Sequence, residues 1–159
     1  MIVPIIIAVV LLIIDQLTKY AALTQLKPVG SVTFIDGFMD FTFVENRGAA
    51  FGILHGKIWL LLLIAAVICV VIICAMRKMP DTKEYKFLKW SLMLILAGAV
   101  GNIIDRLVRG YVVDFFEFTF IRWPVFNMAD IYVVVGTIVM AIIVLFFIKD
   151  DKEEKDAGK

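Results

Sequence analysis

The stretch I-W-L-L-L-L-I-A-A-V-I-C-V-V-I-I-C-A-M, residues 58–76, contains nineteen residues without a single charge. An α-helix rises about 1.5 Å per residue, and crossing the hydrocarbon core of a bilayer takes roughly 20 apolar residues. This stretch is therefore predicted to be a membrane-spanning helix. The rest of the chain agrees, because 62% of its 159 residues are hydrophobic and its mean hydropathy is +0.97. Soluble domains have roughly 45–50% apolar residues.

Three more apolar stretches are predicted to cross the membrane. Together with the stretch 58–76, they give four predicted spans: residues 2–26, 58–76, 87–106 and 128–148. The N-terminal stretch could instead be the apolar region of a cleaved signal peptide. No basic residues precede it, however, and polar residues follow it where small residues would mark a cleavage site. We expect one integral membrane domain over residues 1–148, an all-α four-transmembrane-helix bundle.

The distribution of Lys and Arg predicts the orientation, since short cytoplasmic loops are enriched in both. Basic residues gather in the loop 77–86 and in the charged tail 149–159, which are both expected in the cytoplasm. Four spans then place the N-terminus in the cytoplasm as well. The segments 27–57 and 107–127 are left outside. The tail carries both signs of charge and no aromatic residue, so we expect it to be solvated and disordered.

The outer segments are expected to hold some regular structure. Residues 31–45 read S-V-T-F-I-D-G-F-M-D-F-T-F-V-E, two aromatic and β-branched runs joined by Asp36-Gly37. This turn dipeptide is favoured in hairpins, so a small extracytoplasmic β-hairpin is predicted. Residues 115–123 are predicted to form a short interfacial helix or strand. Four phenylalanines of the hairpin either contact lipid or a lipidated ligand, or cover the helix ends: Phe34, Phe38, Phe41 and Phe43.

Polar residues interrupt the predicted spans, although a charge at the bilayer centre costs roughly 2.5–3.5 kcal/mol. The helical rise places the acids of three spans in one layer, in the outer third of the hydrocarbon core. The polar residues 45–48 reach the same level from outside. Some acids have basic neighbours and can form helix-end ion pairs or orient a substrate, and the sequence leaves both roles open. These pairs are Asp15 with Lys19 and Asp105 with Arg106.

Asp114 and Asp130 have no basic residue at helical spacing. If the fold brings them together, their charges remain unneutralised. Two carboxyl groups in close proximity tend to share one proton, and the pair then titrates as a unit. Aspartic proteases use this arrangement to activate water.

Five motifs occur in a fixed order along the chain. They are D-Q-L-T-K (15–19), E-N-R-G-A-A-F-G (45–52), G-N-I-I-D-R (101–106), V-V-D-F (112–115) and N-M-A-D (127–130). With these motifs the chain resembles the lipoprotein signal peptidases, or type II signal peptidases, of bacteria. The hairpin would correspond to the β-cradle of that family.

The resemblance implies an intramembrane aspartyl endopeptidase of the bacterial cell membrane. Such an enzyme removes the signal peptide from diacylglyceryl-modified prolipoproteins, cutting before the lipidated cysteine. The resemblance implies that Asp114 and Asp130 are the catalytic dyad. It also implies residues that position the substrate or brace the dyad: Asp15, Lys19, Asn46, Arg47, Gly48, Asn102, Asp105, Arg106 and Asn127.

The expected partners are lipid-modified prolipoproteins and membrane lipids, and we expect a monomer. Neither a nucleic acid, a metal nor another cofactor is expected, because the charge is nearly balanced and the single histidine, His55, lacks a second ligand nearby. A serine or cysteine peptidase is disfavoured, since His55 is the one possible base and both cysteines lie outside the polar layer.

Two other classes of function compete with a peptidase. A proton-coupled carrier would distribute its acids across the membrane or place them at the midplane of an inverted repeat. A non-catalytic assembly subunit would use the polar layer to hold helices together.

The outer segments contain Gly37, Gly48 and Gly52, which act either as hinges for a clamping motion or as ordinary turn residues.

Overall fold

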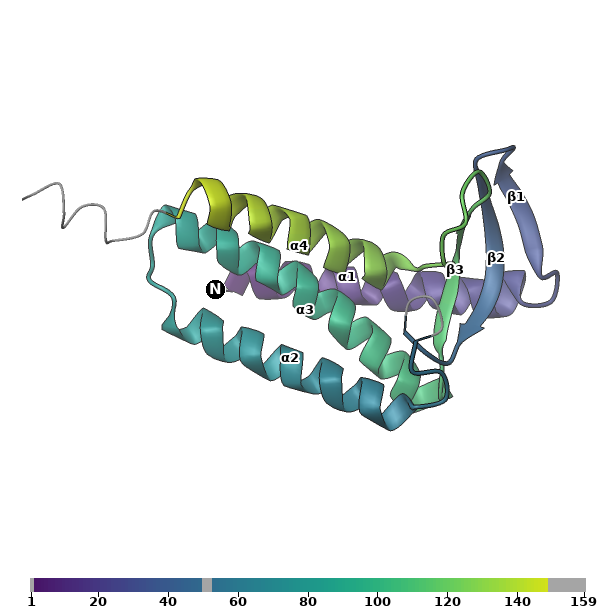
Figure 1. Cartoon of the computed structure of the whole chain (residues 1–159), viewed down its shortest axis with the longest axis horizontal. Coiled ribbons are helices and arrows are strands. Elements are labelled where there is room, and N and C mark those ends of the chain that lie inside the picture. The colour runs from purple at the N-terminus through teal and green to yellow at the C-terminus, as the bar shows by residue number, and fades with distance from the viewer. Residues whose placement is uncertain (1, 50–52, 149–159) are drawn as a thin grey trace, which may run out of the picture.

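The computed structural model describes residues 2–49 and 53–148. The predicted tail and the candidate hinge Gly52 lie outside these residues, as does part of the second motif. Within the described residues, four helices are long and apolar enough to cross a membrane. They are α1 (Ile2–Ala21, continued by the π-helical turn η1, Ala22–Leu26), α2 (Ile58–Lys78), α3 (Lys83–Arg109) and α4 (Met128–Phe146). Figure 1 shows an elongated bundle with a small sheet at one end, which confirms the predicted fold class.

Helix α3 extends beyond the apolar stretch 87–106 at both ends. Its first turn contains Lys83 and its last turn contains Arg109, so the chain continues in helical form into polar sequence. The helix ends at Gly110, whose φ of +75° is left-handed and whose N–H donates to the Arg106 carbonyl oxygen at 3.2 Å. Glycine adopts this conformation without steric cost, which explains the sharp end of the helix.

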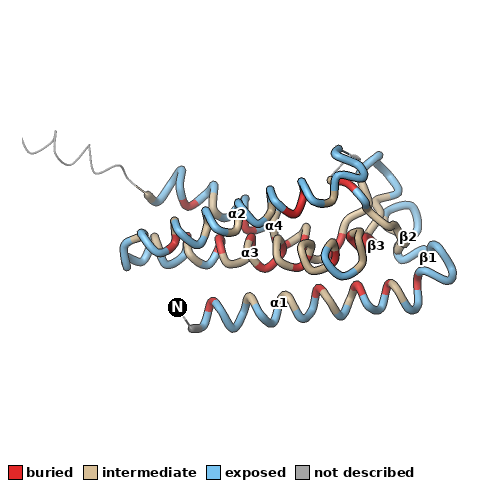
Figure 2. Tube along the Cα trace, turned by 90° about the horizontal axis from the view of Figure 1, so that it is seen from below, coloured by how far each residue is buried: buried red, intermediate tan, exposed pale blue. Residues whose placement is uncertain are grey.

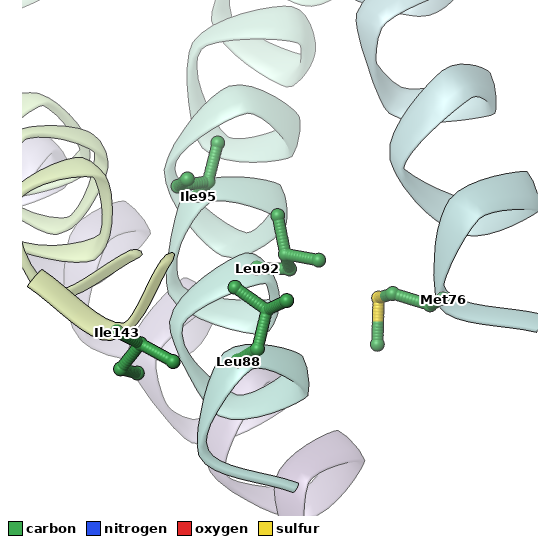
Figure 3. Packing of buried hydrophobic residues seen from close by; sticks show 5 residues of the cluster. All are labelled: Met76, Leu88, Leu92, Ile95 and Ile143. Atoms are coloured by element: carbon green, nitrogen blue, oxygen red, sulfur yellow. The ribbon is translucent and has the colours of Figure 1, made fainter. Parts of the chain in front are cut away.

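The helices pack closely along α3. At the end distant from the sheet, a cluster of buried residues joins α2, α3 and α4 (Figure 3): Met76, Leu88, Leu92, Ile95 and Ile143. Glycines allow α3 and α4 to approach each other closely. A Cβ atom on Gly136 would lie 2.8 Å from the Ser91 carbonyl oxygen, and one on Gly98 would collide with the Ala129 carbonyl oxygen. Small residues at helix contacts are typical of membrane bundles.

The outward faces of the helices are exposed over most of their length (Figure 2). Helix α2 is the clearest case, because it packs chiefly against α3 and its Trp59 side chain is 80% exposed. Large apolar side chains on such faces would be unfavourable in water. They are well solvated by hydrocarbon, so the bilayer is the environment that this surface fits.

The sheet contains three antiparallel strands in the order β1 (Ser31–Ile35), β2 (Met39–Asn46) and β3 (Val112–Phe118). The turn between β1 and β2 contains Gly37 with φ of +68°, which confirms the predicted hairpin. Of the segment 115–123, for which the sequence left helix or strand open, residues 115–118 belong to the strand β3, and residues 119–123 form neither helix nor strand. The register pairs Val44 with Asp114, next to a bulge on the side of Phe41.

The hairpin phenylalanines divide between the two roles that the sequence left open. Phe41 and Phe43 are half-buried and pack against a cluster that includes Leu26 at the end of α1. Phe34 and Phe38 are exposed, by 58% and 44%. The first two therefore cover the helix end, and the second two remain accessible to other molecules.

A buried ion network joins α1 to α3. The Lys19 side chain is fully buried, and its Nζ lies 3.0 Å from Asp15 Oδ2 and 3.2 Å from Asp105 Oδ2. Lys19 Nζ also donates a hydrogen bond to Asn102 Oδ1 at 2.8 Å. The predicted pair of Asp15 with Lys19 is confirmed. One cation therefore compensates acids from two helices.

The predicted pair of Asp105 with Arg106 is wrong. Asp105 Oδ1 instead accepts from Arg109 at 2.5 Å. Adjacent residues of a helix point about 100° apart, whereas residues four apart share one face. The Arg106 side chain turns the other way and donates to the carbonyl oxygens of Asn102 (3.2 Å) and Gly48 (3.0 Å).

Replacing Lys19 by Met should strongly destabilise the protein, because it leaves the buried Asp15 carboxylate without a cation and leaves Asp105 with Arg109 alone. Breaking a buried ion pair by removing one partner costs about 3–5 kcal/mol. Thermal unfolding of the purified protein in detergent measures the effect. Lys86→Met is the matched control, since Lys86 forms an exposed pair with Asp81 at 3.8 Å and its loss should change little. Equal unfolding temperatures for the two variants would contradict the importance of the network.

Candidate functional site

Asp114 lies in β3 beside the N-terminal end of α4, with 1% of its surface exposed. Its Oδ2 accepts a hydrogen bond from Asn46 Nδ2 at 2.8 Å, and its Oδ1 accepts one from Asn127 Nδ2 at 2.6 Å. Burial raises the pKa of Asp114 to about 7, and the nearby charge of Asp130 acts in the same direction. The two amide hydrogen bonds act in the opposite direction but do not offset burial. The carboxyl group is therefore poised to exchange a proton near neutral pH.

Asp130 lies in the first turn of α4, where it forms a capping box with Asn127. Asn127 Oδ1 accepts from the Asp130 N–H at 3.0 Å, and Asp130 Oδ2 accepts from the Asn127 N–H at 3.1 Å. The other carboxyl oxygen, Oδ1, accepts from Asn102 Nδ2 at 2.8 Å. The capping box fixes the backbone of the helix start and the orientation of the Asp130 carboxyl group together.

Asparagine amides connect the two aspartates. Asn127 Nδ2 donates to Asp114 and also to Asn102 Oδ1, the latter at 3.2 Å. Asn102 in turn donates to Asp130 and accepts from Lys19. Among the described residues, neither Asp114 nor Asp130 forms an ion pair, so the carboxyl groups are held by neutral donors. The folded chain thus gathers the two acids into one polar cluster without a cation in contact with either.

The acids bound to Lys19 hold the backbone next to each aspartate. Asp15 Oδ1 accepts from the Ala129 N–H at 2.9 Å, one residue before Asp130. Asp105 Oδ2 accepts from the Val113 N–H at 3.0 Å, one residue before the other aspartate. Positions of both aspartates are thereby linked to the same buried cation.

Two further residues complete this support. Gly101 must lack a side chain, because a Cβ there would lie 2.5 Å from Asp15 Oδ2. Gln16 Nε2 donates to Asp15 Oδ2 at 3.1 Å and to Asp105 Oδ1 at 3.3 Å. Gln16 was not among the predicted site residues, although its place in the motif D-Q-L-T-K was an available signal. Arg109 was also missed, and its spacing of four from Asp105 could have identified it.

The segment after β2 supplies the remaining candidate residues. Asn46 contacts Asp114, and its Oδ1 accepts from the Gly48 N–H at 3.0 Å, while Arg106 holds the Gly48 carbonyl. The structure therefore brings Asn46, Gly48 and Arg106 to the cluster. Arg47 points elsewhere. It is exposed, pairs with Glu45 at 2.9 Å and lies over the Tyr111 ring.

Two cavities reach the cluster. One of about 570 Å³ is lined by both aspartates, by Arg106 and by apolar residues of α4 such as Val134. The other, of about 880 Å³, is lined by residues of the sheet and of the segment 119–125 and also touches Asp114. In the described part of the chain, no group of three or more His, Cys, Asp or Glu side chains is arranged to hold a metal ion. The arrangement suits proton transfer to and from a water molecule placed between carboxyl groups.

The chain is similar to known proteins in sequence and in fold. It is 44% identical over 142 residues to the lipoprotein signal peptidase of Caldanaerobacter subterraneus subsp. tengcongensis, covering 89% of this chain and 95% of that protein. It is 41% identical over 143 residues to that of Clostridioides difficile, covering 90% and 95%. A solved bacterial membrane enzyme has a TM-score of 0.82 and 37% identity, covering 90% of this chain and 87% of that one. Since residues 7–147 also match the signal peptidase II model, the chain belongs to the signal peptidase II family.

Proposed function

We propose that this protein removes the signal peptide from diacylglyceryl-modified prolipoproteins, cutting before the lipidated cysteine, with Asp114 and Asp130 as an aspartyl dyad. Family membership supports the reaction class, and the name of the relatives, lipoprotein signal peptidase, supports the substrate class. The observation that supports the assignment of the dyad is the polar cluster around the two aspartates. Two buried acids lie together, held by neutral amides, at a cavity that is apolar on its α4 side.

In the proposed mechanism the two aspartates share one proton around a water molecule. The ionised carboxylate takes a proton from this water as the water oxygen attacks the scissile carbonyl carbon. The protonated carboxyl group donates its proton to the carbonyl oxygen, which gives a neutral gem-diol. Return of a proton to the amide nitrogen then breaks the C–N bond and releases the new amine. No covalent enzyme intermediate forms.

Neighbouring residues would serve this mechanism by fixing the carboxyl groups. Asn46, Asn102 and Asn127 donate to carboxyl oxygens and so determine which oxygens remain available to water and substrate. The ion network of Lys19 would keep the two aspartates at a constant separation through the backbone of their preceding residues. Arg106 would keep the segment 46–48 beside the cavity.

We further propose that residues 1–148 form one membrane domain and that the protein acts as a monomer with both termini in the cytoplasm. Basic residues support this orientation, because Arg77 and Lys78 end α2 and Lys83 and Lys86 lie at the start of α3, at the end opposite the sheet. The sheet and the aspartates would then lie near the outer face of the membrane. Acyl chains of a substrate could stay in lipid while its cleavage site meets water.

Replacing either aspartate by Asn should abolish cleavage of a diacylglyceryl-modified prolipoprotein by the purified protein. Each variant removes one of the two groups that exchange protons, and general acid–base catalysis contributes about 10²–10⁴-fold to a rate. A gel-shift assay measures the loss, and it should be at least about 100-fold for Asp114→Asn and for Asp130→Asn. Asp81→Asn, at an exposed position remote from the site, is the control. Folded dyad variants that cut at a rate comparable to this control would refute the assignment.

Cleavage should also decline as the pH rises above about 7, the pKa of Asp114. A raised carboxyl pKa means that the proton is retained up to that pH and lost above it, and the dyad needs this proton as its acid. The negative charge of Asp130 helps Asp114 to keep its proton, whereas the positive charges of Lys19 and Arg106 favour its loss. The measurement is kcat/KM from pH 6 to pH 9, with a decrease of about tenfold per unit at the alkaline end. A constant kcat/KM over this range would contradict the protonated-acid role.

A further inference from the structure

The two cavities at the site meet at Asp114. Both are lined by Asn46, by Phe118 and by the segment 123–125, which forms a common wall between them. A polypeptide cut at Asp114 would therefore have one part in each cavity. Because this wall separates the cavities, the two parts of a substrate would contact different residues.

The cavities differ in chemistry. The 570 Å³ cavity continues along α4, where Ile131, Val134 and Val135 offer apolar contacts. The 880 Å³ cavity is lined by charged side chains of the sheet and by Arg122, beside apolar residues of the segment 119–125. If the protein acts as proposed above, the signal peptide and the acyl chains of a prolipoprotein need the apolar cavity. The residues that follow the lipidated cysteine, which belong to the water-soluble mature chain, would then enter the charged cavity.

The charges of this second cavity are not all compensated. Glu45 is neutralised by Lys27 and Arg47, each at 2.9 Å. Asp40 and Glu117 are direct cross-strand partners of β2 and β3, and neither forms an ion pair within residues 2–49 and 53–148. Like charges directly opposite each other on neighbouring strands are destabilising. A cation between them would relieve this repulsion.

We propose that the Asp40–Glu117 pair makes the enzyme prefer substrates with Lys or Arg, over those with Asp or Glu, in the first residues after the lipidated cysteine. The pair lines the cavity into which these residues would extend, and it lacks a basic partner there. Arg122 lines the same cavity from the segment after β3 and acts in the opposite sense. The preference thus depends on the two acids outweighing both Arg122 and the surplus positive charge that Lys27 and Arg47 leave beside Glu45.

The test uses two diacylglyceryl-modified prolipoproteins that differ only at the second and third residues after the cysteine, Lys-Lys in one and Asp-Asp in the other. Both are mixed with the purified full-length protein, and the ratio of their kcat/KM values is measured by competition at low salt. We expect the Lys-Lys substrate to be preferred about five- to tenfold and the preference to decline in 0.5 M NaCl, because salt screens exposed charges. The double variant Asp40→Asn, Glu117→Gln should bring the ratio close to one. Arg122→Gln, the matched variant of opposite sign, should raise it.

The outcomes separate this proposal from the proposed function. Efficient cleavage of both substrates at equal rates would overturn the charge selection and leave the peptidase function intact. A preference that persists in the double variant would also overturn it. Failure of folded protein to cut either substrate would refute the peptidase function and, with it, the selection.

Discussion

The buried ammonium group of Lys19 is the interaction on which the arrangement of the site depends. Charges removed from water are tolerated when they are paired and hydrogen-bonded, and Lys19 has two carboxylates and an amide oxygen around it. Each of these carboxylates also accepts a hydrogen bond from a backbone N–H: Asp105 from Val113 in β3 through Oδ2, and Asp15 from Ala129 in α4 through Oδ1. These are the residues before Asp114 and Asp130. A strand and a helix that are distant in sequence are thereby set relative to each other through one cation.

The bilayer accounts for the rest of the design. Helices α1 and α2 expose large apolar side chains over most of their surface, which hydrocarbon solvates well. In the bilayer, burial of apolar side chains therefore does not determine how the helices pack, as it does in a water-soluble protein. Close contacts at Gly98 and Gly136 and the polar network at the sheet end supply that specificity. A peptidase also needs water, and polar groups gathered at one end of the bundle provide a place where it can meet the reacting bond.

Much of this architecture follows from local sequence patterns. The length of the apolar stretches predicts the four helices. The Asp36-Gly37 turn predicts the hairpin, and the spacing of Asp15 and Lys19 predicts their ion pair. Features that depend on distant pairing could not be predicted in this way. The strand β3 joins β2 by hydrogen bonds between residues far apart in the chain, and neither the pairing nor its register has a local signal.

Side-chain direction was equally difficult to predict. Asp105 pairs with Arg109 because both lie on the same helical face, while its neighbour Arg106 faces the segment 46–48. Arg47 belongs to the motif E-N-R-G-A-A-F-G, yet it points to Glu45 and away from the aspartates. The amide links through Asn102 and Asn127 join residues of α3, β3 and α4, and they appear only once the fold is complete.

We have proposed that this protein cuts lipid-modified prolipoproteins before the modified cysteine. The most direct measurement incubates the purified protein with a diacylglyceryl-modified prolipoprotein and, separately, with its unmodified precursor, and identifies the products by mass spectrometry. We expect cleavage of the modified form alone, with one product beginning at the lipidated cysteine and no mass added to the enzyme. Equal cleavage of both forms, cleavage at another bond, or no cleavage by folded protein would contradict it.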